Sequence, residues 1–160
     1  MSARKALLLI DDEVIVRKML AAFLRPFFDV YTAGDAFEAL EIIFGFRAQA
    51  LPCKFEELSR FIQNHVNTDQ THEGALLIQP DLIVADIKMP KINGFQLIHL
   101  LRRYLPDIPV FMITGFEDEG YNQEVIRLKI NEILAKPFSP MLLLDKIKET
   151  VPIQPETNPS

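Results

Sequence analysis

Charged and hydroxyl side chains directly follow four short apolar runs of the sequence. They are Asp11 and Asp12, then Asp86, Thr114 and Lys136. Three carboxylates crowded in a partly desolvated pocket repel one another, which raises their pKa values unless a cation offsets the charge. A hard divalent ion is the natural occupant, and Mg²⁺ with several retained waters suits a shallow site of oxygen ligands. These residue types predict a magnesium-binding site, provided that the fold brings them together.

The same residues predict phosphoryl-transfer chemistry. With Mg²⁺ and the Lys136 ammonium nearby, one carboxylate can act as a nucleophile toward a phosphoryl group, because both cations stabilise charge on the phosphoryl oxygens. The Thr114 hydroxyl can donate a hydrogen bond to one of those oxygens. Taken singly, an aspartate after a strand commonly caps a helix, and a lysine before a proline is commonly solvated. Four such coincidences at four strand ends favour the chemical interpretation.

These side chains can meet only if the apolar runs are strands of one sheet. The runs are Ala6–Ile10, Leu82–Ala85, Val110–Ile113 and Ile133–Ala135, with a weaker fifth candidate at Asp29–Ala33. The four main runs do not alternate with a period of two, which is typical of parallel strands buried on both faces. The carboxyl ends of neighbouring parallel strands lie about 4.8 Å apart at one edge of the sheet. The chemistry is therefore expected at that edge.

Segments of helical period separate the strands. They are Val14–Leu24, a helix that begins after Asp35, and then Phe95–Tyr104, Gly120–Lys129 and Met141–Thr150. In the first helix, Val14, Met19, Ala22 and Phe23 fall toward one side. Asp35, with a glutamate three residues later, has the pattern of a capping box. The alternation of strand and helix predicts an α/β sandwich of three layers around a parallel sheet.

One connection is too long for such a fold. Roughly 38 residues separate Ile43 from Leu82, whereas α/β units are usually joined by about 2–6 residues. Within this stretch, apolar side chains recur at helical spacing, namely Phe55, Leu58, Phe61, Ile62 and Val66. We predict an inserted amphipathic helix over Lys54–Asn67 that packs against an extended second helix through Phe44 and Leu51. The alternative is that its apolar face binds another chain, most simply a second copy in a homodimer.

Composition limits the remaining classes. The chain has 160 residues, of which 49% are hydrophobic, enough to bury one core. A single cysteine, Cys53, cannot form an internal disulfide. The net charge of −5 disfavours direct nucleic-acid binding. No leader pattern opens the chain and no apolar run could span a membrane. We therefore expect a cytoplasmic protein with neither nucleic acid nor membrane as a direct partner.

The motifs at the strand ends occur in a characteristic order. They are Asp11-Asp12-Glu13, then Asp86-Ile87-Lys88-Met89-Pro90 with Asn93-Gly94, then Thr114-Gly115, and finally Lys136-Pro137-Phe138. One of these alone is a weak signal, but the ordered set is specific. Over Lys5–Ile43 and Pro80–Val151 the chain resembles a response-regulator receiver domain, the phosphoacceptor module of two-component signalling.

The resemblance implies a fold. It is a flavodoxin-like, doubly wound, five-stranded parallel sheet of order 2-1-3-4-5, here with a helical insertion between the second helix and the third strand. Residues 5–151 would form a single receiver domain that includes an inserted segment at about 44–79. Residues 152–160, rich in proline, would form a flexible tail or the start of a linker.

The resemblance also implies a mechanism and partners. Asp86 would accept a phosphoryl group from a phosphohistidine on a sensor histidine kinase or a phosphotransfer protein, and the domain would then switch contacts with an output partner. Lys136 would pair with the phosphoryl oxygens and Thr114 would donate a hydrogen bond to them. The Mg²⁺ ligands would be Asp11, Asp12, Asp86 and the backbone carbonyl of Lys88. Such a protein is a signalling switch rather than a metabolic enzyme.

Two positions beside the expected site are unusual or variable in the family, and the first of them keeps another function open. Ile133 occupies the position of the usual switch aromatic, which predicts a smaller conformational change. Phe116, two residues after Thr114, could shield the phosphorylated aspartate from water. One alternative is a phosphorylation-independent docking or dimerisation module that uses the inserted helix. Another is a Mg²⁺-dependent phosphohydrolase with an aspartyl nucleophile, although Glu13 then stands where a second aspartate is usual.

Overall fold

The computed structural model describes residues 4–66, 76–115 and 120–153, which form one α/β domain around a parallel sheet. The strands are β1 (Ala6–Ile10), β2 (Asp29–Ala33), β3 (Leu82–Asp86), β4 (Val110–Thr114) and β5 (Glu132–Ala135). All four neighbouring pairs are parallel and the order is β2-β1-β3-β4-β5. Ile10 is level with both Ala33 and Ala85, so the strands end at a common edge. The predicted sheet and strand order are confirmed.

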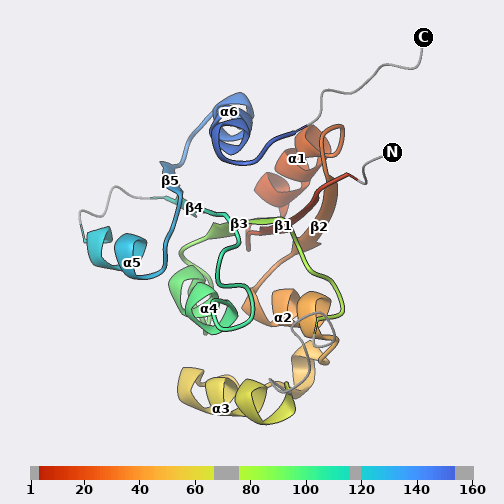
Figure 1. Cartoon of the computed structure of the whole chain (residues 1–160), viewed down its shortest axis with the longest axis vertical. Helices are drawn as coiled ribbons and strands as arrows, with labels where there is room; N and C mark the ends of the chain where they lie inside the picture. Colours follow the sequence, from red (N-terminus) through yellow and green to blue (C-terminus); the bar gives the residue numbers. More distant parts are fainter. Residues whose placement is uncertain (1–3, 67–75, 116–119, 154–160) are drawn as a thin grey trace.

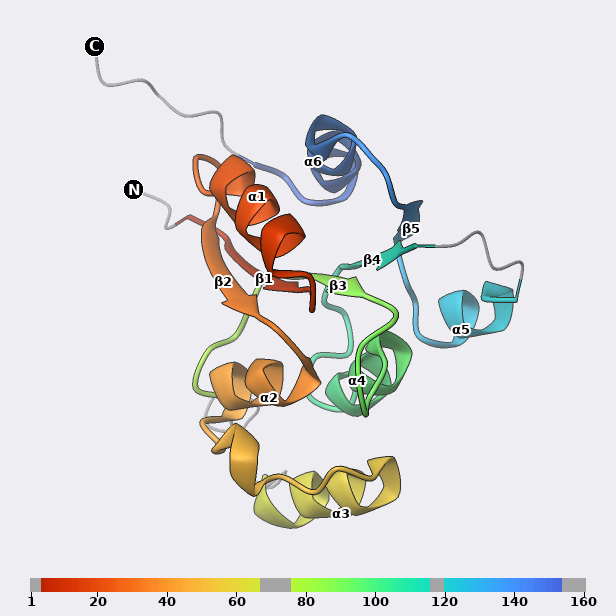
Figure 2. The same ribbon diagram turned by 180° about the vertical axis from the view of Figure 1, so that it is seen from behind.

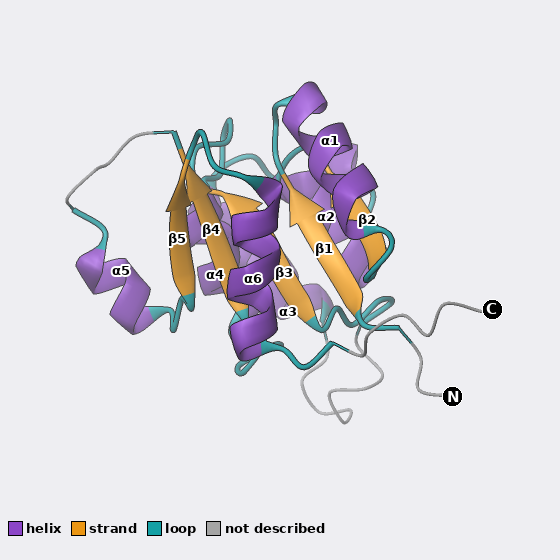
Figure 3. Cartoon of the chain, turned by 90° about the horizontal axis from the view of Figure 1, so that it is seen from above, coloured by secondary structure: helices purple, strands orange, loops and turns teal. Residues whose placement is uncertain are grey.

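Helices cover both faces of this sheet. They are α1 (Val14–Leu24), α2 (Ala36–Phe44), α3 (Phe55–His65), α4 (Gly94–Leu101), α5 (Asn122–Arg127) and α6 (Pro140–Thr150), with a short 3₁₀ turn, η1 (Ala48–Ala50), after α2. Figure 3 shows α1 and α6 in front of the sheet and α2 and α4 behind it. Among the described residues, no helix is both long enough and apolar enough to span a membrane.

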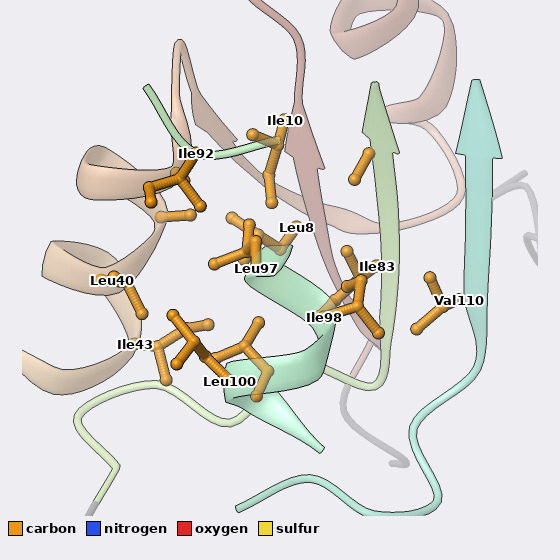
Figure 4. Close-up of a cluster of buried hydrophobic side chains, with 14 of the residues drawn as sticks. Leu8, Ile10, Leu40, Ile43, Ile83, Ile92, Leu97, Ile98, Leu100 and Val110 are labelled. Atoms are coloured by element: carbon orange, nitrogen blue, oxygen red, sulfur yellow. The ribbon is translucent and has the colours of Figure 1, made fainter. Parts of the chain in front are cut away.

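The two faces of the sheet bury separate apolar clusters. On β1, Leu8 and Ile10 belong to the cluster beneath α2 and α4, whereas Leu7 and Leu9 belong to the cluster beneath α1 and α6. Figure 4 shows the first cluster, in which Leu8 and Ile83 of the sheet meet helical side chains such as Leu40 and Leu97. A central strand buried on both faces needs apolar side chains at every position, which explains the unbroken runs in the sequence.

The buried face of α1 is not the side on which its apolar residues Val14 and Met19 lie. Its buried residues are Leu20, Ala21 and Leu24. Val14 and Met19 are about half exposed, at 50% and 49%. The first turn of α1 begins at the edge of the sheet, so its apolar residues extend past the layer that the sheet can cover. These side chains are surface features rather than core.

The inserted helix α3 forms a further layer outside α2 and α4 (Figures 1 and 2). Leu58 and Ile62 are buried in the cluster that α2 and α4 share, as are Leu51 and, in part, Phe44. The Phe55 ring lies 5.8 Å from the ring of His99 on α4. The apolar face of α3 is therefore covered within the chain, on α4 as well as on α2.

The second helix is not extended, contrary to the prediction. It ends at Phe44 because Gly45 adopts a left-handed conformation, with φ 78°, that a side chain would strain.

The insertion also begins and ends at neighbouring points. The carbonyl of Ile43 in the last turn of α2 accepts hydrogen bonds from the backbone N–H groups of Leu77 (2.6 Å) and Ile78 (3.3 Å).

Candidate functional site

Three acidic side chains meet at the carboxyl edge of the sheet. Asp11 follows β1 and Asp86 ends β3, and these strands are direct neighbours. One carboxylate oxygen from each of Asp11, Asp12 and Asp86 lies within 4.8 Å of the others. Asp11 and Asp86 are buried and Asp12 is exposed, so the cluster opens to solvent on one side. The predicted acidic residues therefore do come together.

The two oxygens of the buried Asp11 carboxylate have different partners. Its Oδ1 accepts a hydrogen bond from the backbone N–H of Glu13 at 2.9 Å. Its Oδ2 is buried and forms an ion pair with the Lys136 ammonium at 3.2 Å. A buried carboxylate oxygen needs a donor or a cation to offset the cost of its burial. Beside two further carboxylates, it fits the oxygen ligands that a hard divalent cation prefers.

Lys136 brings a positive charge into this cluster from the residue after β5. Its Nζ lies 2.7 Å from Glu13 Oε1, 3.2 Å from Asp11 Oδ2 and 3.2 Å from Asp86 Oδ2. Burial alone would lower the pKa of the Lys136 ammonium, but the hydrogen bond to Glu13 and the charges of Asp86 and Asp11 raise it above its ordinary value. The Lys136 side chain therefore stays protonated and places a positive charge beside the Asp86 carboxylate.

Opposing effects of burial and of neighbouring charges set the pKa of Asp86. Burial raises its pKa, the Lys136 charge lowers it, and the charges of Asp11 and Asp12 raise it again, which leaves the pKa at about 6. The carboxylate is therefore ionised at neutral pH but destabilised, first by its burial and then by the neighbouring negative charges of Asp11 and Asp12. An additional cation would relieve this repulsion.

The remaining predicted site residues border the same edge. Thr114 ends β4 and is buried, one position beyond the residue that pairs with Asp86. Lys88 is exposed and its backbone N–H donates to Asp86 Oδ1 at 3.3 Å. Ile133 packs against the cluster beneath α2 and α4. Phe116 lies outside the described residues.

The sequence profile of the response regulator receiver domain matches residues 61–148, just over half of the chain. The chain belongs to this family. The match begins within α3. The fold and the motifs are what place β1 and the aspartates after it in the receiver domain.

Receiver domains of known structure share this fold. The chemotaxis protein CheY4 of Vibrio cholerae aligns with a TM-score of 0.62 and 22% identity, over 92% of this chain and 98% of that one. A signal receiver domain of an HD domain-containing protein from Pseudomonas fluorescens aligns with a TM-score of 0.65 and 19% identity, over 92% of this chain and 94% of that one.

The curated relatives are transcriptional regulators. The phosphate regulon regulator PhoB of Pseudomonas aeruginosa is 28% identical over 90% of this chain and 50% of its own length. The alkaline phosphatase synthesis regulator SphR of Synechococcus elongatus is 26% identical over 86% of this chain and 45% of its own length. The chain thus spans about half the length of these relatives, and it is a receiver domain of the two-component signalling type.

The sequence analysis named Gly94 only as part of a motif and missed its structural role in this receiver domain. Gly94 is the first residue of α4, and its backbone N–H donates to Ile87 O at 2.8 Å. A Cβ at this position would lie 2.4 Å from the backbone oxygen of Asp86 and 2.6 Å from Met112 Cε. The glycine lets α4 begin directly on the backbone of Asp86, and the Asn93-Gly94 pair was the available signal.

We expect Gly94→Ala to destabilise the domain by about 2 kcal/mol, because the added methyl group must displace backbone rather than a flexible side chain. Urea unfolding measures the loss. The control is Gly120→Ala, since a Cβ at Gly120 would meet nothing within 4 Å. Equal stability of the two variants would contradict the close approach at Asp86.

Proposed function

We propose that this receiver domain accepts a phosphoryl group on Asp86 from a phosphohistidine of a sensor histidine kinase or phosphotransfer protein, and that the modification switches its protein contacts. One observation carries the proposal. The Asp86 carboxylate lies 3.2 Å from the Lys136 ammonium, at the open edge of a cluster of three carboxylates. This combination supports an anionic nucleophile with positive charge ready for the incoming oxygens.

The ligands proposed for Mg²⁺ are Asp11, Asp12, Asp86 and the backbone carbonyl of Lys88. When bound, the ion would neutralise charge on the carboxylates and on the phosphoryl oxygens. The fit rests on the three clustered carboxylates, of which Asp11 and Asp86 are buried.

The proposed transfer is a single displacement at phosphorus. An Asp86 carboxylate oxygen attacks, a new P–O bond forms and the P–N bond to the donor imidazole breaks. The electron pair of that bond returns to the imidazole nitrogen, which takes up a proton from solvent. Lys136 pairs with the phosphoryl oxygens and the Thr114 hydroxyl donates to one of them. Water later hydrolyses the aspartyl phosphate and restores the carboxylate.

We assign residues 5–151 to one receiver domain that includes the insertion at about 44–79, with 152–160 as a tail. Most of that tail lies outside the described residues. A docking function of the insertion is disfavoured, because Leu58 and Ile62 of α3 are buried against the chain itself. An output partner and a homodimer remain proposals that would use other surfaces.

The direct test of this function is phosphorylation by acetyl phosphate, which requires no protein partner. Intact mass should show the gain of one phosphoryl group in the presence of Mg²⁺. The gain should disappear when EDTA replaces Mg²⁺. No gain under conditions that label another receiver domain would contradict the proposal.

Apolar side chains border the site where a donor protein must approach. Val14, Ile15 and Met19 of α1 are 50%, 83% and 49% exposed, and Met141 and Leu142 of α6 are 53% and 43% exposed. α1 begins directly after Glu13, and α6 begins at Pro140, a short distance along the chain from Lys136. A phosphohistidine can reach Asp86 only if the donor surface covers this rim. We therefore assign the rim to docking of the phosphoryl donor.

Replacement of Ile15 separates docking from chemistry. We expect Ile15→Asp to slow transfer from a phosphorylated donor protein about tenfold, as for loss of one central contact in an interface. Labelling by acetyl phosphate should stay unchanged, because this small donor needs no rim. Ile126→Asp is the matched control, since Ile126 is also highly exposed, at 79%, but lies on α5. Equal slowing by both variants would contradict a specific docking rim.

A further inference from the structure

The Lys136 ammonium and the expected metal ion depend on the same carboxylates. Lys136 Nζ lies 3.2 Å from both Asp11 Oδ2 and Asp86 Oδ2, and these two residues also belong to the acidic cluster that could hold a metal. Two cations that share carboxylates at such distances repel each other and compete for the same negative charge. Binding of Mg²⁺ therefore requires that the ammonium be drawn away from the cluster.

Glu13 is the carboxylate that can draw the ammonium away. Its Oε1 is the closest acidic oxygen to Lys136 Nζ, at 2.7 Å. Glu13 is not among the carboxylates that cluster as a metal site, and its side chain is 58% exposed, against 0% for Asp11. It thus gives the ammonium a more solvent-exposed partner outside the metal cluster.

The local backbone of Glu13 gives independent support. Glu13 is the N-cap of α1, a position where a side-chain oxygen usually accepts a hydrogen bond from the first turn of the helix. Its side chain makes no such bond and faces Lys136 instead. The backbone is fixed meanwhile, because its N–H donates to Asp11 Oδ1 and its carbonyl accepts from Arg17 N. Only the side chain is free to follow the lysine.

The Lys136 ammonium contacts Asp11, Asp86 and Glu13 at the same time. We propose that Glu13 is a positioning residue that retains Lys136 at the rim when a metal ion takes Asp11 and Asp86, so that the ammonium stays within reach of the incoming phosphoryl group. The inference rests on the proposed Mg²⁺-dependent function. Without the Glu13 charge, the ammonium turns toward Asp11 and Asp86 and opposes the metal. Glu13 acts through Lys136 and does not need to touch the metal.

A double-mutant cycle with Lys136→Met tests this route. Mg²⁺ affinity of the unphosphorylated full chain is measured by isothermal titration calorimetry, so the readout does not depend on phosphorylation. We expect Glu13→Gln to weaken Mg²⁺ binding about fivefold, the scale of a partly exposed ion pair. In the Lys136→Met background the same substitution should have little effect. If Lys136→Met fails to fold, Lys136→Gln provides an equivalent background.

The outcomes separate this inference from the proposed function. Equal weakening in both backgrounds would mean that Glu13 acts only by its charge at a distance, and would overturn the proposal. No weakening in either background would overturn it as well. If the wild-type chain binds no Mg²⁺, both this inference and the proposed Mg²⁺ dependence are wrong. Glu56→Gln is the control for net charge, because exposed Glu56 lies on α3 in the insertion.

Discussion

Asp86→Asn is expected to abolish phosphorylation by acetyl phosphate, because the amide removes the anionic oxygen that would attack phosphorus. Intact mass spectrometry checks this directly. Asp12→Asn should be labelled slowly rather than not at all, since it weakens the proposed metal site without removing the nucleophile. Full labelling of the Asp86→Asn variant would place the phosphoryl group on another residue and contradict the assignment.

Asp86→Asn should also stabilise the metal-free domain. A stable variant that is not phosphorylated would show that the loss of labelling does not result from a loss of folding. The Asp86 pKa lies at about 6 instead of 3.8, which corresponds to roughly 3 kcal/mol against the ionised folded state at neutral pH. Below pH 3.8 the carboxyl is protonated in both states and this penalty is absent. The penalty grows as pH rises and is complete above about pH 6.

The stability difference between Asp86→Asn and the wild type should therefore change with pH in a defined direction. In EDTA, the stability difference between Asp86→Asn and the wild type should increase as the pH is raised from about 4 to about 7. Urea denaturation at several pH values measures it. A difference that stays constant across this range would contradict the raised pKa of Asp86.

Arg102→Met is expected to destabilise the domain by about 3 kcal/mol, because it leaves several backbone carbonyls without a donor. Arg102 follows α4, and its guanidinium joins the chain before β4 to the chain after α5. It donates to the carbonyl oxygens of Leu105 (3.1 Å), Pro106 (3.4 Å), Ile108 (2.7 Å), Leu128 (2.7 Å) and Lys129 (3.1 Å). Burial lowers the pKa of this guanidinium, partly offset by the Asp107 charge.

Two comparisons isolate the role of this guanidinium. Arg103→Met changes the exposed neighbouring arginine and should alter the free energy of unfolding by less than about 0.5 kcal/mol. Arg102→Lys keeps the charge but lacks the planar fork of donors, so it should recover little of the loss. Recovery of full stability by lysine would show that charge alone matters. Thermal or urea unfolding measures all three variants.

Local patterns in the sequence predicted the strands and the site residues, because these features depend on residues that are neighbours in the sequence. The strands are short apolar runs with polar ends, and their bounds were predicted to within one residue, as for β2 at Asp29–Ala33. The site residues follow those strands, so a correct sheet order places them at one edge. The start of α6 is local in the same way, with Ser139 Oγ accepting from Met141 N and Pro140 as the first helical residue.

Features that depend on tertiary contacts could not be read in the same way. Helical periodicity alone could not show that Val14 and Met19 lie at a rim rather than in the core. The contacts of Arg102 join segments far apart in sequence, and no local pattern marks them. For Glu13, the motif drew attention to the residue, but only the 2.7 Å contact with Lys136 indicates a role.

The hydrogen bonds from Leu77 and Ile78 to the carbonyl of Ile43 hold the two ends of the insertion next to each other. The chain departs from the sheet layers and returns to them at nearly the same place. The length between such points affects stability mainly through loop closure, at roughly 0.6 kcal/mol for each doubling. A segment of another length could therefore be grafted between Gly45 and Leu76 while the strands and the acidic edge keep their geometry, provided that it covers the apolar surface of α2 and α4 that Leu58 and Ile62 now cover.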